Sequence, residues 1–62
     1  MNIPGALDVA ALARMHFYAL SPREQATAVR RMAAERQGVH TIAQATGLSV
    51  EQVRRILRGE QP

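Results

Sequence analysis

Val39–Arg58, VHTIAQATGLSVEQVRRILR, is the stretch that decides the fold. Apolar residues recur at helical spacing on both sides of Gly47, a residue type that adopts positive φ at low steric cost. Ser49 follows as a possible N-cap, and the glutamine three positions later can complete a capping box. The pattern therefore predicts two short helices, about Val39–Ala45 and Val50–Arg58, joined by a tight turn.

The chain before this stretch predicts two more helices. Ala6–Leu20 is rich in alanine and leucine and contains no helix breaker. Ser21 and Glu24 form a second capping-box pattern around a proline, which predicts a helix over Pro22–Arg36. Gly38 either ends that helix or caps the next one. Since nothing predicts a strand, we expect a single all-α domain of about four short helices, with the two-helix unit in its C-terminal half.

The first predicted helix is apolar on most of its surface. One stripe contains Met15 and Tyr18, and another contains Leu12 and Phe17. A surface helix normally has a charged side, so a helix that is apolar on two sides needs two neighbours. We expect the second neighbour to be another copy of the chain. The predicted contacts of this homodimer are Leu12, Met15, His16 and Phe17.

Composition narrows the functional classes. The chain has no cysteine, and His16 and His40 lack partners for a zinc site, so we expect no metal. It shows no paired carboxylates, catalytic triad or glycine-rich phosphate loop, so we expect no enzyme activity, no cofactor and no small-molecule substrate. No stretch is long and apolar enough to span a membrane, and the N-terminus lacks a signal peptide's basic region. We therefore expect a cytoplasmic protein with no membrane partner.

All eight basic residues are arginines, and five acidic residues leave a net charge of +3. The positive charge lies in the last two-thirds of the chain. On charge alone, a solvated surface and GC-rich coding explain the arginines better than a nucleic-acid partner does. The placement of the arginines is therefore more informative than their number.

Val39–Arg58 resembles the helix-turn-helix of DNA-binding proteins. In that family a small residue lies where the second helix crosses the first, a glycine makes the turn, and apolar residues close the core. The matching residues here are Ala43, Gly47, Leu48, Val53 and Ile56. The preceding segment, LSPREQATAVRRMAAERQG, resembles the helix before this unit in ParB-like partition proteins and LuxR-type response regulators. Small phage and plasmid repressors, anti-CRISPR-associated autoregulators among them, are similar free-standing proteins.

The resemblance implies sequence-specific binding of double-stranded DNA. A helix-turn-helix places its second helix in the major groove, where arginine contacts guanine and glutamine contacts adenine. Arg54 and Arg55 are the predicted base contacts, followed by Gln52 and Glu51, and Arg58 is expected at phosphate. The full set of predicted DNA-binding residues is Ser49, Val50, Glu51, Gln52, Arg54, Arg55, Arg58, His40 and Thr41.

We expect a small transcriptional repressor or autoregulator that binds an inverted repeat as a homodimer. A second interpretation is a protein-interaction adaptor that uses the apolar first helix as its docking face. Arg54 and Arg55 also fit a solvated helix face, with one of them paired with Glu51 at helical spacing. Arg30 and Arg31 fit a phosphate contact and a solvated face equally well.

Overall fold

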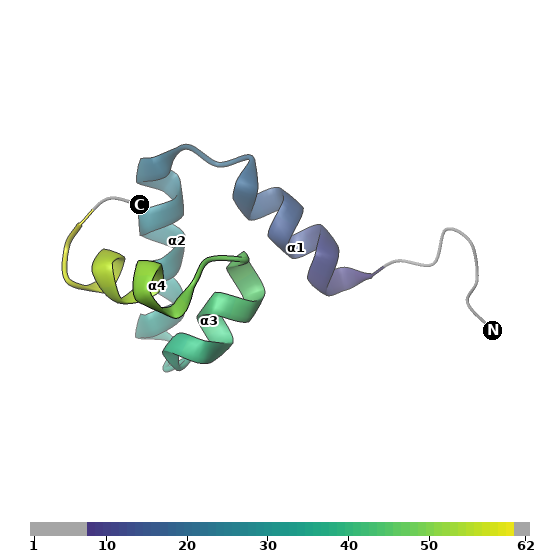
Figure 1. The fold of residues 1–62 in the computed structure, drawn as a ribbon. Helices are drawn as coiled ribbons and strands as arrows, with labels where there is room; N and C mark the ends of the chain where they lie inside the picture. The colour runs from purple at the N-terminus through teal and green to yellow at the C-terminus, as the bar shows by residue number, and fades with distance from the viewer. Residues whose placement is uncertain (1–7, 61–62) are drawn as a thin grey trace.

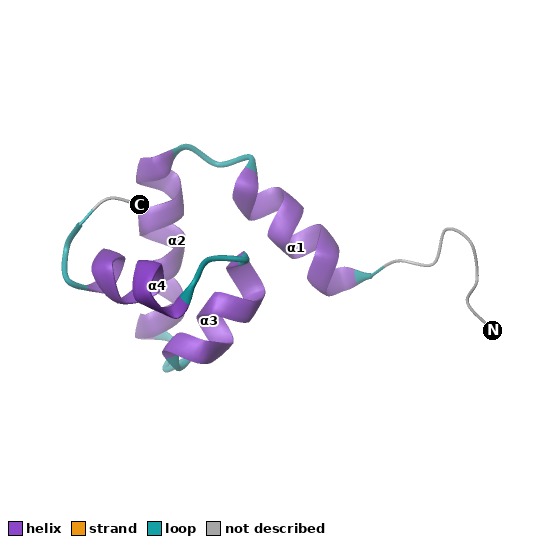
Figure 2. Cartoon of the chain, viewed as in Figure 1, coloured by secondary structure: helices purple, strands orange, loops and turns teal. Residues whose placement is uncertain are grey.

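A computed structural model describes residues 8–60, and in that part the protein consists of four α-helices and no strand (Figure 1, Figure 2). The helices are α1 (Val9–Tyr18), α2 (Pro22–Ala34), α3 (Val39–Thr46) and α4 (Val50–Leu57). The predicted all-α fold class is confirmed. The predicted start of the first helix, Ala6–Leu7, lies outside the described residues. None of the described helices is both long and apolar enough to cross a bilayer.

A side-chain cap determines where α1 begins. The Asp8 carboxylate accepts a hydrogen bond from the Ala11 amide at 3.1 Å, and the Asp8 backbone is extended. Asp8 was predicted to lie inside the helix, but its short carboxylate satisfies a free amide of the first turn more effectively from the N-cap. At the other end α1 stops at Tyr18, two residues before the predicted Leu20.

The two predicted capping boxes are confirmed. In the first, the Glu24 amide donates to Ser21 Oγ at 3.2 Å, and the Ser21 amide donates to Glu24 Oε1 at 2.8 Å. In the second, the Gln52 amide donates to Ser49 Oγ at 3.1 Å, and the Ser49 amide donates to Gln52 Oε1 at 2.9 Å. Each box satisfies amides that have no partner inside the helix, so α2 and α4 begin where the sequence predicts.

Residues in the left-handed region follow or end three of the helices. Gly47 ends α3 with φ +81°, and Gly59 follows α4 with φ +97°. Helix α2 ends at Ala34 rather than at the predicted Arg36, because Arg36 has φ +69° and turns the chain away. Gly38 has an ordinary φ of −76° and is the N-cap of α3, which settles its two possible roles.

The core lies where the four helices meet. Helix α4 packs against α2 and α3, whereas α1 packs mainly against α3 (Figure 1). The buried apolar residues are Phe17, Ala26, Val29, Ile42, Val53 and Ile56. Ala43 and Leu48 pack against them from α3 and the turn, as predicted. Leu57, the last residue of α4, is 38% exposed and lies at the edge of the core.

Phe17 determines which side of α1 faces the protein. Its side chain is only 5% exposed, and its carbonyl accepts a hydrogen bond from Gln25 Nε2 of α2 at 3.2 Å. Phe17 was predicted at a dimer interface, but it belongs to the chain's own core. Leu12, its predicted stripe partner, is exposed, because five residues at about 100° each place the two side chains far apart around the helix. Met15 and Tyr18 are exposed as well.

Candidate nucleic-acid interface

The solvent-facing side of α4 carries four of the nine predicted DNA contacts. Val53 and Ile56 are fully buried on the opposite side of the helix. The outer face of α4 consists of the exposed residues Glu51, Arg54, Arg55 and Arg58. Since α-helical residues repeat every 3.6 positions, these four side chains form one strip along the helix. A strip of three arginines and one glutamate is thus held away from the core by the packing beneath it.

Glu51 lies at the centre of this outer face and pairs with two of its arginines. Glu51 Oε2 is 3.4 Å from Arg55 Nε and 3.4 Å from Arg58 Nη2. Arg58 Nε is also 3.5 Å from Glu60 Oε2. The hydrogen bond from Arg58 is the main cause that lowers the pKa of Glu51 below its ordinary value. All of these side chains are more than half exposed, so the pairs are screened by solvent and contribute little to stability.

Arg54 has a different environment from Arg55. Within residues 8–60, no carboxylate oxygen lies within 4 Å of the Arg54 guanidinium, whereas Arg55 pairs with Glu51. The sequence ranked the two arginines together, because both follow Glu51 on the same helix. The structure distinguishes them: Arg54 is immediately available to an acceptor, and Arg55 must first leave Glu51.

The capping box of α4 restricts what Gln52 can contact. Bidentate recognition of adenine requires the glutamine amide to donate and to accept. Gln52 Oε1 already accepts from the Ser49 amide, which uses one of its two lone pairs and orients the side chain toward the start of the helix. The predicted contact of Gln52 with adenine must therefore either fit this cap or break it. Val50, at the start of the helix, is half-buried.

The start of α3 brings two further predicted residues to the surface. His40 and Thr41 are exposed in its first turn. Thr41 also lines a shallow hollow of about 660 Å³ between α1 and α3, together with Gln44 and Arg14. The sequence analysis did not single out Arg14, which lines this hollow. The available signal was that Arg14 is the one arginine in a helical segment whose residues are mostly apolar.

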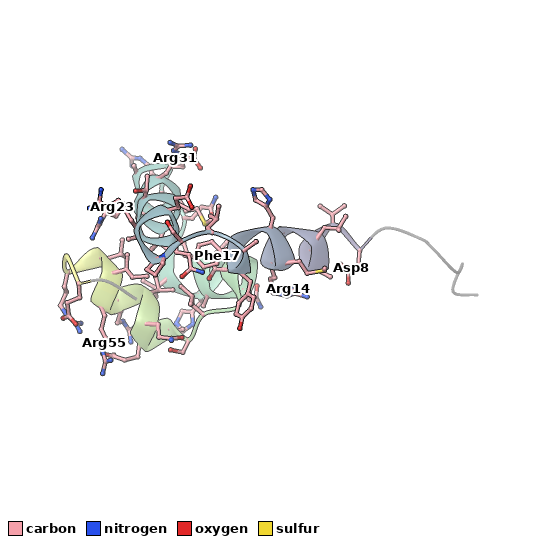
Figure 3. All side chains as sticks on the ribbon, turned by 90° about the horizontal axis from the view of Figure 1, so that it is seen from above. Asp8, Arg14, Phe17, Arg23, Arg31 and Arg55 are labelled. Atoms are coloured by element: carbon pink, nitrogen blue, oxygen red, sulfur yellow. The ribbon has the colours of Figure 1, made fainter. Side chains whose placement is uncertain are left out.

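The arginines of α2 do not join the outer face of α4. Arg30 Nη2 donates to the Ile56 carbonyl at 3.4 Å, which ties α2 to the last turn of α4. Viewed as in Figure 3, Arg31 lies at the top of the molecule and Arg55 at its lower left, whereas Arg14 lies to the right, on the lower edge of α1. Of the two arginines left open by the sequence, Arg30 makes an interhelical contact, and Arg31 is exposed.

The chain matches no protein-family model, no curated protein and no solved structure. Within the described residues, no group of three or more histidine, cysteine, aspartate or glutamate side chains is placed to hold a metal ion. The candidate interface is therefore interpreted from its own geometry and charge.

Proposed function

We propose that the protein binds double-stranded DNA sequence-specifically, with α3 and α4 acting as a helix-turn-helix and α4 entering the major groove. One observation carries this proposal. Helix α4 exposes three arginines directly opposite its buried residues, and it follows α3 after a turn of three residues that begins at Gly47 in the left-handed region. Such a turn between two short helices is the arrangement used by helix-turn-helix proteins, whose second helix contacts base edges.

The charge pattern of α4 assigns a role to each arginine. Arg54 pairs with no carboxylate within residues 8–60, so it becomes the first base contact, through a guanine edge. Arg55 exchanges its exposed pair with Glu51 for DNA at small cost, since exposed ion pairs contribute little. Arg58, near the end of the helix, contacts phosphate. His40 and Thr41, in the first turn of α3, contact the phosphate backbone of the DNA.

A single copy of α4 contacts too few base pairs to define a specific DNA site. Its eight residues span about 12 Å, roughly a third of one turn of DNA. We therefore propose a homodimeric repressor or autoregulator on an inverted repeat, acting in the cytoplasm. The outer face of α1, consisting of Val9, Leu12 and Met15, is the proposed dimer contact, because these side chains are 73%, 46% and 67% exposed.

Selection of bound sequences from random duplex DNA tests the proposal, followed by anisotropy titrations on the selected site. Arg54→Ala with Arg55→Ala should weaken binding at least about 30-fold, since each bidentate contact contributes about 1–3 kcal/mol. The fold should survive, because both side chains are exposed. Arg23→Ala with Arg31→Ala is the matched control: it removes the same charge from α2 and should leave site preference unchanged. Unchanged affinity in the first double variant would reject the assignment of α4.

The outer face of α1 also favours a second candidate function, a protein-interaction adaptor. In that case the apolar side chains of α1 dock on another protein and α4 plays no part. Salt distinguishes the two functions. Binding to DNA through several arginines weakens steeply as salt rises, whereas docking through an apolar face hardly responds.

A further inference from the structure

Arg14 of α1 lies over the turn that joins α3 to α4. A β-carbon placed on Gly47 would be 3.5 Å from Arg14 Cδ and 3.9 Å from Arg14 Cγ, so the aliphatic part of the arginine packs on the turn. The residue as a whole is half-buried. Because the stem is held by packing, the guanidinium loses little conformational freedom when it binds a partner.

The surroundings of the Arg14 guanidinium suit an anion. Within residues 8–60, no carboxylate oxygen lies within 4 Å of it. The hollow beside it is lined by Thr41 and Gln44, whose hydroxyl and amide groups can donate hydrogen bonds. A positive charge among neutral donors, with no acid to neutralise it, is the chemistry that recognises a phosphate oxygen.

The position of Arg14 matches the border of the groove that α4 would enter. Three Cα steps separate Gly47 from Val50, the first residue of α4, so the two lie within about 11 Å of each other. The major groove is about 12 Å wide, so a side chain over Gly47 would reach the phosphates along its edge. In Figure 3, Arg55 lies at the lower left of the molecule and Arg14 lies farther to the right, on the lower edge of α1.

We infer that Arg14 binds a DNA phosphate next to the groove occupied by α4, with Thr41 and Gln44 beside it. This inference rests on the proposed function and extends the interface onto α1, outside the helix-turn-helix unit. Its role is to position α4 on the duplex rather than to select bases. Helix α1 thereby serves the interface through Arg14 on its inner side and leaves its apolar outer face exposed.

The test measures how binding to a mixed-sequence 24-base-pair duplex depends on salt, between about 50 and 200 mM. Loss of one phosphate contact lowers the slope of log affinity against log salt by about 0.9. Arg14→Met keeps an apolar stem on Gly47 and removes the charge, so its slope should be about 0.9 smaller than that of the wild type. Between about 50 and 200 mM salt, the variant should therefore lose about 3.5-fold less affinity than the wild type loses. Arg14→Lys should retain the wild-type slope.

Arg31→Met is the matched control, because it removes one positive charge from α2, at the top of the molecule in Figure 3. It should keep the wild-type slope, and far-UV circular dichroism should report a folded chain for every variant. If Arg14→Met unfolds, the slope is measured on Arg14→Gln instead. A wild-type slope without the Arg14 charge, or an equal fall in Arg31→Met, overturns the inference while leaving the proposed function intact. Failure of the wild-type protein to bind duplex DNA overturns the proposed function itself.

Discussion

Arg36 has a backbone conformation that arginine disfavours. Among the described residues, it is the only non-glycine with positive φ, at +69°. The conformation is imposed by the end of α2: the Arg36 amide donates to the Ala33 carbonyl at 3.0 Å, and the Gln37 amide donates to the Met32 carbonyl at 3.1 Å. This pair of bonds is the Schellman motif, whose left-handed position usually holds glycine. Gly59 holds the equivalent position after α4 with φ +97°.

Replacing Arg36 by glycine should therefore stabilise the protein. Glycine relieves a left-handed strain of about 1–2 kcal/mol, and this exceeds the entropic cost of a more flexible unfolded chain. The free energy of unfolding should therefore rise by about 0.5–1 kcal/mol. Thermal unfolding followed by circular dichroism should show a higher midpoint, since 1 kcal/mol corresponds to about 4–8 °C in a domain of this size. Gly59→Ala is the opposite control and should lower the midpoint. A lower midpoint for Arg36→Gly would contradict the strain argument.

At the scale of the element, the start of α2 depends on a side chain that titrates. The pKa of Glu24 lies below its ordinary value of 4.5, first because the Ser21 amide donates to its carboxylate. A carboxyl group whose pKa is lowered by folding stabilises the protein above its unfolded pKa, and this stability is lost as pH falls through the folded pKa. The start of α2 should therefore weaken below about pH 4.5.

Glu24→Gln tests this linkage, because glutamine can still accept the bond from the Ser21 amide but does not titrate. Urea unfolding is measured at intervals between about pH 7 and pH 3. Wild-type stability should fall over the acid part of this range, and Glu24→Gln should lose less. Adding Glu51→Gln should reduce the loss further, since the pKa of Glu51 is also lowered, chiefly by its hydrogen bond from Arg58. An acid loss in Glu24→Gln as large as in the wild type would exclude a role for this carboxylate.

At the scale of the whole molecule, α1 is the helix with an unused face. It packs mainly against α3 and extends away from α2 and α4 (Figure 1). Its ten residues span about 15 Å, too little for the roughly 800 Å² per partner of a standard interface. The proposed dimer should therefore be weak without DNA, with a dissociation constant on the order of tens of micromolar.

Leu12→Glu should disrupt this dimer without unfolding the chain, because Leu12 is 46% exposed in the single copy. Burial of a carboxylate from each copy would weaken association more than about tenfold. Sedimentation velocity over a range of concentrations should give a rising mass for the wild type and a monomeric mass for the variant. Ala34→Glu, at an exposed position of α2, is the control and should associate as the wild type does. A monomeric wild type at all concentrations would exclude the contact through α1.

The sequence by itself determined the local structure of this protein. Capping pairs such as Ser49 with Gln52 act between residues three positions apart, so they are visible in the chain and hold in the fold. The turn at Gly47 and the burial of Val53 and Ile56 followed from the same short-range patterns. Four helices and the buried side of α4 were therefore predictable without coordinates.

The tertiary structure decided which surfaces remain available. An apolar helix contains no local signal for which of its sides will be covered, so the burial of Phe17 depended on where α1 meets α3 and α2. Helical spacing allowed Glu51 to pair with either Arg54 or Arg55. Side-chain geometry selects Arg55, and within residues 8–60 Arg54 has no carboxylate partner. The contact between Arg14 and Gly47 joins residues 33 positions apart, and only folding brings them together.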